Sequence, residues 1–283
     1  MNRISKLIVL FFLLCPSLAV AEEYAVAMIT DMNGISRNIV NKQAQQVDIF
    51  SELFAGDQLE IEKHASVTLI YWDNHKVFQI QGPSVVHILK DSIQHVSGHK
   101  PKMKKITLLH HARINPAEVA QSGLVMRSAQ KNKPISLLNL RGGKTADKRP
   151  TFLWKLHQKK DRVRFELVDE DGNMLLVKVL NGERFTLPAS VHLKTGTVYS
   201  WSVEGRMGNG QVFADWGDFE LATASLVAQK NNIQPKAHAG FSQRLLYAAW
   251  LQQNGFGDDA HHLWLKLAKE RPNSPALKAT LLN

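Results

Sequence analysis

The feature that most constrains the fold is a series of short, strand-like runs, each ended by a turn, in the first third of the chain. Residues 66–72 are rich in β-branched and aromatic side chains and stop at an Asp-Asn turn signal. Residues 76–80 alternate polar and apolar side chains, which is typical of a strand buried on one face. A Gly-Pro break precedes a further run over residues 84–89. Strands at such short intervals predict an all-β unit.

A second series of strands occupies residues 150–224. Val163, Phe165 and Leu167 alternate with polar residues and would share one face of a strand. The acidic, glycine-containing segment 169–173 reads as a turn, and residues 174–179 return as the partner strand of a hairpin. The segment is long enough for the seven or so short strands of a β-sandwich.

The periodicity changes to that of a helix at residue 240. A break at residues 255–257 separates two apolar stripes, Asp258 is placed to cap the second helix, and that helix should end before Pro272. We therefore predict a short C-terminal helical hairpin over residues 240–283. A single hairpin of this kind cannot bury its own apolar face, so we expect it to dock on the second β unit or on a partner. The stripes comprise Leu245, Leu246, Ala249 and Trp250 in the first helix, and Ala260, Leu263, Trp264, Leu267 and Ala268 in the second.

The first 21 residues have the pattern of an export signal. Arg3 and Lys6 precede an apolar run over residues 7–14, and a small-x-small cleavage site ends at Ala21. The run is too short to span a bilayer, and no later segment predicts a transmembrane helix. We expect cleavage after Ala21 and a periplasmic location. Cys15 is the only cysteine, so the mature chain would lack both disulfides and thiolate chemistry.

The net charge of +10 is distributed unevenly along the chain. Residues 100–164 hold 17 lysines and arginines against three acids, so this segment carries +14. Two clusters in it are candidates for binding polyanions by charge neutralisation, with cell-wall or lipopolysaccharide groups as partners and no nucleic acid expected. The alternative is a solvated or interdomain surface covered by the acidic ends of the chain. The candidate residues are Lys100, Lys102, Lys104, Lys105, Lys155, Lys159, Lys160, Arg162 and Arg164.

Motifs that would indicate catalysis or metal binding are incomplete. The adjacent histidines at 110–111 and 261–262 would point in different directions, which makes them poor joint ligands. Residues 141–145 resemble the end of a phosphate-binding loop, but Leu138 stands where that motif needs glycine. A calcium loop that began at Asp169 would need glycine at its sixth position, where Met174 stands. We therefore expect no enzyme activity, no cofactor and no metal site. A glycosidase with carboxylates on distant strands stays open.

Three segments resemble known families. Residues 53–59 (Leu-Phe-Ala-Gly-Asp-Gln-Leu), 65–69 (Ala-Ser-Val-Thr-Leu) and 77–86 (ending in Gly-Pro-Ser-Val-Val) resemble the turn and strands of the FecR-type periplasmic domain. This resemblance covers residues 24–98 and implies a β domain with a part in envelope signalling. We do not expect the transmembrane and cytoplasmic parts of the namesake regulator here, so direct signalling to a sigma factor is not expected.

The two later segments have resemblances of their own. The spacing Pro150-x-Phe152-x-Trp154, together with Tyr199 and Trp201 further on, is similar to fibronectin-III or immunoglobulin-like sandwiches. The C-terminal segment resembles a single tetratricopeptide-like hairpin, with Ala248, Gly255, Ala260 and Pro272 at the matching positions.

These observations predict a mainly β protein: a FecR-like β domain, an immunoglobulin-like β-sandwich and a short C-terminal α-helical hairpin. Its function is predicted to be that of a non-enzymatic periplasmic or cell-envelope interaction or scaffolding protein, with envelope proteins as its partners. A ligand-sensing accessory of an envelope signalling system and a polyanion or glycan binder using the basic central region are the alternatives. The expected boundaries are 1–21 for the signal peptide, 22–98 for the first domain, 99–149 for a basic linker with short strands, 150–224 for the sandwich, 225–239 for a second linker and 240–283 for the hairpin.

Overall fold

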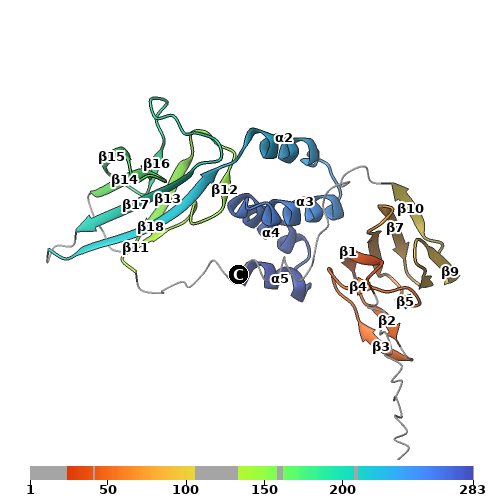
Figure 1. Cartoon of the computed structure of the whole chain (residues 1–283). Helices are drawn as coiled ribbons and strands as arrows, with labels where there is room; N and C mark the ends of the chain where they lie inside the picture. Colours follow the sequence, from red (N-terminus) through yellow and green to blue (C-terminus); the bar gives the residue numbers. More distant parts are fainter. Residues whose placement is uncertain (1–23, 41, 106–132, 158–161, 207–209, 283) are drawn as a thin grey trace, which may run out of the picture.

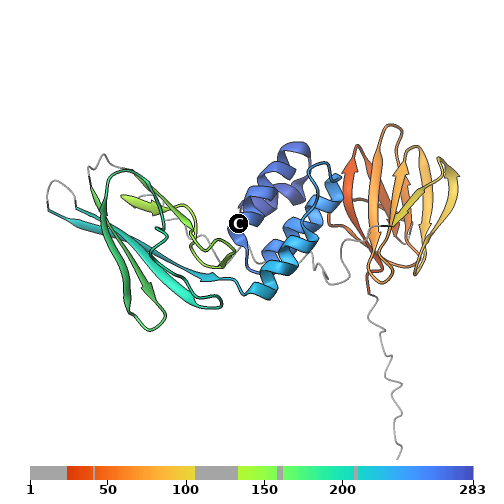
Figure 2. The same cartoon turned by 90° about the horizontal axis from the view of Figure 1, so that it is seen from above.

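The molecule is elongated, with one β unit on either side of a group of helices (Figure 1 and Figure 2). The computed structural model describes residues 24–40, 42–105, 133–157, 162–206 and 210–282. The fold is mainly β with helices at the C-terminal end, as the sequence predicts. We refer to the first β unit (residues 24–105), the second β unit (residues 133–221) and the helical segment (residues 224–282).

The first β unit consists of two five-stranded antiparallel sheets, with strand orders β10-β7-β6-β1-β4 and β3-β2-β5-β8-β9. Alternating side chains from both sheets form its core, as expected for a sandwich. The strand β10, which lies in the expected linker, completes the edge of the first sheet. The strands are β1 (Ala27–Asn33), β2 (Ser36–Val40), β3 (Gln43–Gln46), β4 (Glu52–Leu53), β5 (Gln58–Ile61), β6 (Ser66–Tyr71), β7 (Lys76–Gln81), β8 (Ser84–Ile88), β9 (Ile93–Gly98) and β10 (Lys102–Lys105).

The sheet that contains β1 and β6 is covered on both faces. The Tyr71 hydroxyl donates to main-chain carbonyls in the segment that joins β8 to β9, which places this side chain between the two sheets. Met28 on β1 and Ile70 on β6 are neighbours across this strand pair, and they lie on the face of the sheet opposite to that of Tyr71. Both are nevertheless buried. The cover on their side is the helical segment, because the Thr30 hydroxyl donates to the Ser242 hydroxyl of α3 at 2.9 Å. Near-continuous burial of a strand is the pattern expected when both faces are packed.

The turn before β5 depends on a buried carboxylate. Gly56 takes a φ of 101°, and Asp57 is 7% exposed. The Asp57 carboxylate accepts hydrogen bonds from the main-chain N–H of Phe54 at 2.9 Å and from the Asn38 side chain at 2.7 Å. This turn is the one that the sequence predicted at Gly56 and Asp57, and it ties β4 to β2.

We expect Asp57→Ala to destabilise the first β unit by about 2 kcal/mol, because it leaves the N–H of Phe54 and the amide of Asn38 without their acceptor. Chemical denaturation of the two proteins measures the difference. The matched control is Asp57→Asn, which keeps one acceptor oxygen and should lose less stability. Equal losses for the two variants would contradict this role for the carboxylate.

The second β unit is a sandwich of two sheets, ordered β11-β13-β16 and β12-β18-β17-β14-β15. Its core is aromatic, and Phe152 packs within 4.9 Å of both Phe165 and Trp201, measured between ring centroids. The Tyr199 hydroxyl accepts from the main-chain N–H of Lys194 at 2.7 Å, the kind of contact that fixes a corner in immunoglobulin-type sandwiches. The strands are β11 (Ile135–Leu137), β12 (Lys144–Thr145), β13 (Thr151–Leu156), β14 (Val163–Asp169), β15 (Met174–Leu180), β16 (Arg184–Thr186), β17 (Val198–Arg206) and β18 (Val212–Leu221).

The helical segment is larger than the predicted hairpin, and its buried core is shared with the first β unit. Within the described residues it has four helices: α2 (Ala224–Ile233), α3 (Phe241–Gln253), α4 (Gly257–Glu270) and α5 (Pro275–Leu282). α2 occupies most of residues 225–239, the segment that we expected to be a linker. The helices share one buried core with the first β unit, whereas we expected them to dock on the second unit or on a partner. No helix in the described ranges combines the length and the apolar character needed to cross a bilayer.

Candidate functional site

The first basic cluster lies on the edge strand β10. Lys100, Lys102 and Lys104 are exposed, and none of them forms an ion pair with a residue in the described ranges. The side chain of Lys105 lies outside the described residues. Among the described strands, β10 pairs with β7 alone, which places it at the edge of this sheet. Lysines on an edge strand oppose pairing with another strand, and this gives the cluster a structural role that needs no polyanion.

The second basic cluster is divided between two faces. Lys155 is exposed on β13 of the three-stranded sheet, whereas Arg164 is exposed on β14 of the five-stranded sheet. The Arg164 guanidinium pairs with the Glu166 carboxylate at 2.5 Å, and Arg162 is exposed just before β14. Lys159 and Lys160 lie outside the described residues. β10 and the second β unit lie at opposite ends of the molecule (Figure 1), so the structure does not bring the clusters together.

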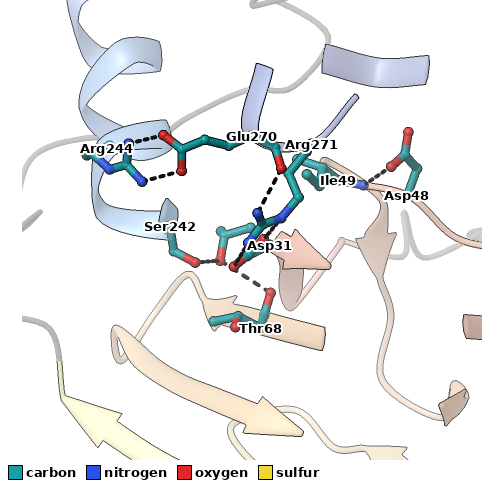
Figure 3. Close-up of polar contacts among 9 residues, drawn as sticks. Asp31, Asp48, Ile49, Thr68, Ser242, Arg244, Glu270 and Arg271 are labelled. Atoms are coloured by element: carbon teal, nitrogen blue, oxygen red, sulfur yellow. Dashed lines mark hydrogen bonds and ion pairs between the residues drawn. The ribbon is translucent and has the colours of Figure 1, made fainter. Parts of the chain in front are cut away.

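The helical segment is joined to the first β unit by a charged pair. Arg271, at the end of α4, donates to both carboxylate oxygens of Asp31 on β1, at 2.8 and 3.0 Å (Figure 3). The side chains are 29% and 21% exposed, so solvent screens this pair less than an exposed one. The guanidinium of Arg271 also stacks over the ring of Phe241 at 4.5 Å, which fixes it in place.

A second contact places a carboxylate at the start of α5. Asp48, in the loop before β4, accepts from the Ser274 hydroxyl and from the main-chain N–H of Ala276, both at 3.0 Å. An anion at a helix N-terminus is favoured by the free N–H groups and by the helix dipole. Beside it, the ring of Phe50 meets the ring of Trp264 edge to face at 5.9 Å. Polar and apolar contacts therefore both connect the helices to this β unit.

Arg244 and Glu270 connect α3 to the end of α4, beside the contact with β1 (Figure 3). Their two hydrogen bonds measure 2.5 and 2.7 Å. The hydrogen bond from Arg244 lowers the pKa of Glu270, and burial opposes this effect only in part. The same hydrogen bond raises the pKa of Arg244.

We expect Glu270→Gln to cost about 0.5 kcal/mol at neutral pH, a small effect because Glu270 is 40% exposed and solvent screens the pair. The pKa of Glu270 is lower in the folded protein than its ordinary value of 4.5, so the unfolded chain binds the proton first. The contribution is therefore complete above pH 4.5 and is lost as the pH falls through the folded pKa. In thermal melts the difference between variant and wild type should be largest at pH 7 and should shrink as the pH is lowered below 4.5. A difference that does not shrink as the pH falls would contradict the assignment.

The helical segment is also joined to the second β unit, on its other side. The main-chain N–H of Lys144 donates to the carbonyl of Gly255, in the turn between α3 and α4, at 2.6 Å. The carboxylate of Asp258 accepts from the main-chain N–H of Leu140 at 2.8 Å. Asp258 lies in the first turn of α4. The N-cap is Phe256, so the prediction that Asp258 caps this helix was wrong.

Close backbone packing at this junction requires glycine at position 143. Gly143 has a φ of 92°, and a Cβ there would lie 2.4 Å from the Gly255 carbonyl oxygen. The backbone of the second β unit therefore lies directly against the α3–α4 turn.

The described surface has a shallow cavity on each β unit and another on the helices. The cavity of the second unit, about 270 Å³, contains Trp216, whose side chain the sequence analysis did not single out. Its signal was the alternation along β18, which turns every second residue outward. The other two measure about 480 Å³, beside Lys63, His64 and His99, and about 230 Å³, between Lys230, Tyr247 and His262.

Neither metal-ligating side chains nor similarity to known proteins identifies a function for these sites. In the part of the chain that the structure describes, no three His, Cys, Asp or Glu side chains come close enough together to hold a metal ion. The histidines at 110–111 lie outside that part. No model of a known protein family matches the chain, and comparison with curated proteins finds no match. The resemblances to FecR-type, fibronectin-III and tetratricopeptide families therefore stay predictions.

Proposed function

We propose that this protein is a non-enzymatic scaffold of the cell envelope, which holds two β units in a fixed arrangement so that each can present a binding surface. The observation that supports this most strongly is the helical segment, which is bonded to the first unit through Asp31 and Arg271 and to the second through Lys144 and Gly255. Two β units joined only by a linker would be expected to move relative to one another.

The contact with the first unit resembles a domain interior more than a surface contact. Helices and sheet share one buried core, in which Leu245, Ala248 and Ala249 of α3 are fully buried. The buried hydroxyl pair of Thr30 and Ser242 adds a directional contact that fixes how α3 lies on β1. A contact of this kind favours one relative placement of helices and sheet.

The location is part of the proposal and rests on the export signal expected over residues 1–21. A FecR-like first unit would fit the same compartment. The polyanion alternative, in the form that used the whole basic region, is not favoured, because its residues lie at opposite ends of the molecule and on two faces of one sandwich. No observation in the described residues specifically favours the sensory alternative.

The proposal is tested by photo-crosslinking in cells that express the full chain. A photoreactive residue at Met103, 54% exposed on β10, reports on the first unit, and one at Val179, 64% exposed on β15, reports on the second. We expect envelope components cross-linked at both positions, and the two products in one complex on native gels. The control is the chain that begins at Glu22, which should remain in the cytoplasm and lose these products. The absence of products at both positions would contradict the proposal.

A further inference from the structure

Trp216 occupies an unusual place for a tryptophan in the second β unit. Its side chain is 68% exposed on the face of the five-stranded sheet that points away from the core. Trp154 and Trp201 of the same unit are almost completely buried and build the core, so Trp216 contributes little to packing. Its neighbour across the strand pair is Ser202, a small polar residue that can cover little of the indole.

The indole lies beside a pocket with a fixed wall, here called the Trp216 pocket. The wall is the segment before β12, whose Gly142 N–H donates to the carbonyl of Asp218 at 2.6 Å. Gly217 permits this close approach, since a Cβ there would lie 2.9 Å from the carbonyl oxygen of Leu140. The pocket has a volume of about 270 Å³ and is lined by Lys133, Arg141, Gly142, Asp215, Trp216, Gly217 and Asp218.

The charged groups of the Trp216 pocket differ in how far other side chains already pair with them. Lys133 and the buried Asp215 neutralise each other through an ion pair of 3.0 Å. The Asp218 carboxylate accepts from the Ser200 hydroxyl at 2.5 Å and keeps further acceptor sites. The Arg141 guanidinium has a single long contact, 3.5 Å to a main-chain carbonyl, and no ion pair with a described residue. A ligand would therefore meet an exposed indole, an available carboxylate and a guanidinium that has no ion pair with a described residue.

We propose that the Trp216 pocket binds a pyranose saccharide that carries a carboxylate. The flat C–H face of a sugar ring can stack on the indole, and its hydroxyls can donate to Asp218. The sugar carboxylate can pair with Arg141, whose planar guanidinium suits a carboxylate in two-point contact. A hot spot for a protein partner is normally enclosed by residues that exclude water. Trp216 is bordered by polar and charged groups, and these match the hydroxyl rim of a sugar.

Two envelope sources have this chemistry: muramic acid of the cell-wall glycan where its carboxyl is not joined to a peptide, and the acidic sugars of the lipopolysaccharide core. The inference rests on the proposed envelope location for the source of its ligand, but it does not rest on the fixed arrangement of the β units.

The test is calorimetric titration of the whole mature chain, residues 22–283, with three probes. These are an N-acetylglucosamine–N-acetylmuramic acid tetrasaccharide, the same tetrasaccharide with its carboxyls reduced to alcohols, and a lipopolysaccharide core oligosaccharide. We expect binding to one of the two acidic probes, which identifies the source. Trp216→Ala should weaken that binding at least tenfold. Arg141→Gln should weaken binding of the acidic probe and remove its advantage over a carboxyl-reduced form.

The matched control is Val179→Ala, a truncation of an exposed residue on the same outer face, which should leave binding unchanged. No binding of wild type to either acidic probe would overturn the inference, as would full binding by Trp216→Ala. Failure of these titrations with intact cross-linking at Met103 and Val179 would overturn this inference alone. Loss of cross-linking with intact titrations would overturn the scaffold proposal alone.

Discussion

Trp264→Ala is expected to lower the free energy of unfolding of the first β unit together with the helices by about 3–5 kcal/mol, because it removes a large buried side chain from their shared core. Trp264 is 2% exposed, contacts the ring of Phe50, and donates from its indole N–H to the Gln252 side chain at 2.7 Å. The second β unit has its own separate core. Differential scanning calorimetry should therefore show one transition moved to lower temperature and a second transition unchanged.

The control for this prediction is Trp216→Ala, the same truncation at an exposed tryptophan. It should change the free energy of unfolding by no more than about 0.5 kcal/mol. The account would be wrong if Trp264→Ala left both transitions in place, or if it lowered the transition of the second β unit by the same amount as that of the first.

Gly143→Ala is expected to loosen the junction between the helical segment and the second β unit and to cost about 3 kcal/mol. The new Cβ would lie 2.4 Å from the Gly255 carbonyl oxygen, and backbone on both sides leaves no flexible side chain to yield. The positive φ of Gly143 adds the strain of the left-handed region. The hydrogen bond from Lys144 to Gly255 should be lost as the two backbones separate.

Gly182→Ala separates the two causes. Gly182 has the same φ of 92°, but a Cβ there would meet no atom within 4 Å. It should cost only the backbone strain, about 1 kcal/mol, and it should leave the junction intact. Equal losses for the two variants, measured by chemical denaturation, would show that close packing at Gly143 is not what holds the junction.

The strands of both β units were largely predictable from the sequence, because alternating patterns and turn residues are local signals. Val163, Phe165 and Leu167 are buried on one face of β14, as their spacing indicates. The acidic turn after them is also confirmed, since the Asp169 carboxylate accepts from the N–H groups of Asp171 and Asn173. The Asn173 side chain and main chain lower the pKa of Asp169 by hydrogen bonding.

The docking of the helices was not predicted, because it depends on residues far apart in the chain. One signal was present: the run at 25–29 is continuously apolar and does not alternate, which is typical of a strand covered on both faces. α2 has no buried side chain and no apolar stripe to reveal it, and only Thr223, whose hydroxyl caps the helix, marks its start. The candidate residues of the two basic clusters are near each other in sequence but are distributed by the topology over separate sheets.

The central claim is that the helical segment holds the two β units in one relative placement. Because Cys15 is the only cysteine, the chain of residues 22–283 has none and accepts a specific pair of spin labels. Labels at Val96→Cys on the first unit and Val179→Cys on the second occupy exposed positions, and pulsed electron resonance measures the distance between them. The account predicts a single narrow distance distribution, which broadens with Gly143→Ala and remains narrow with Gly182→Ala. A broad distribution in the otherwise unmodified chain would contradict it.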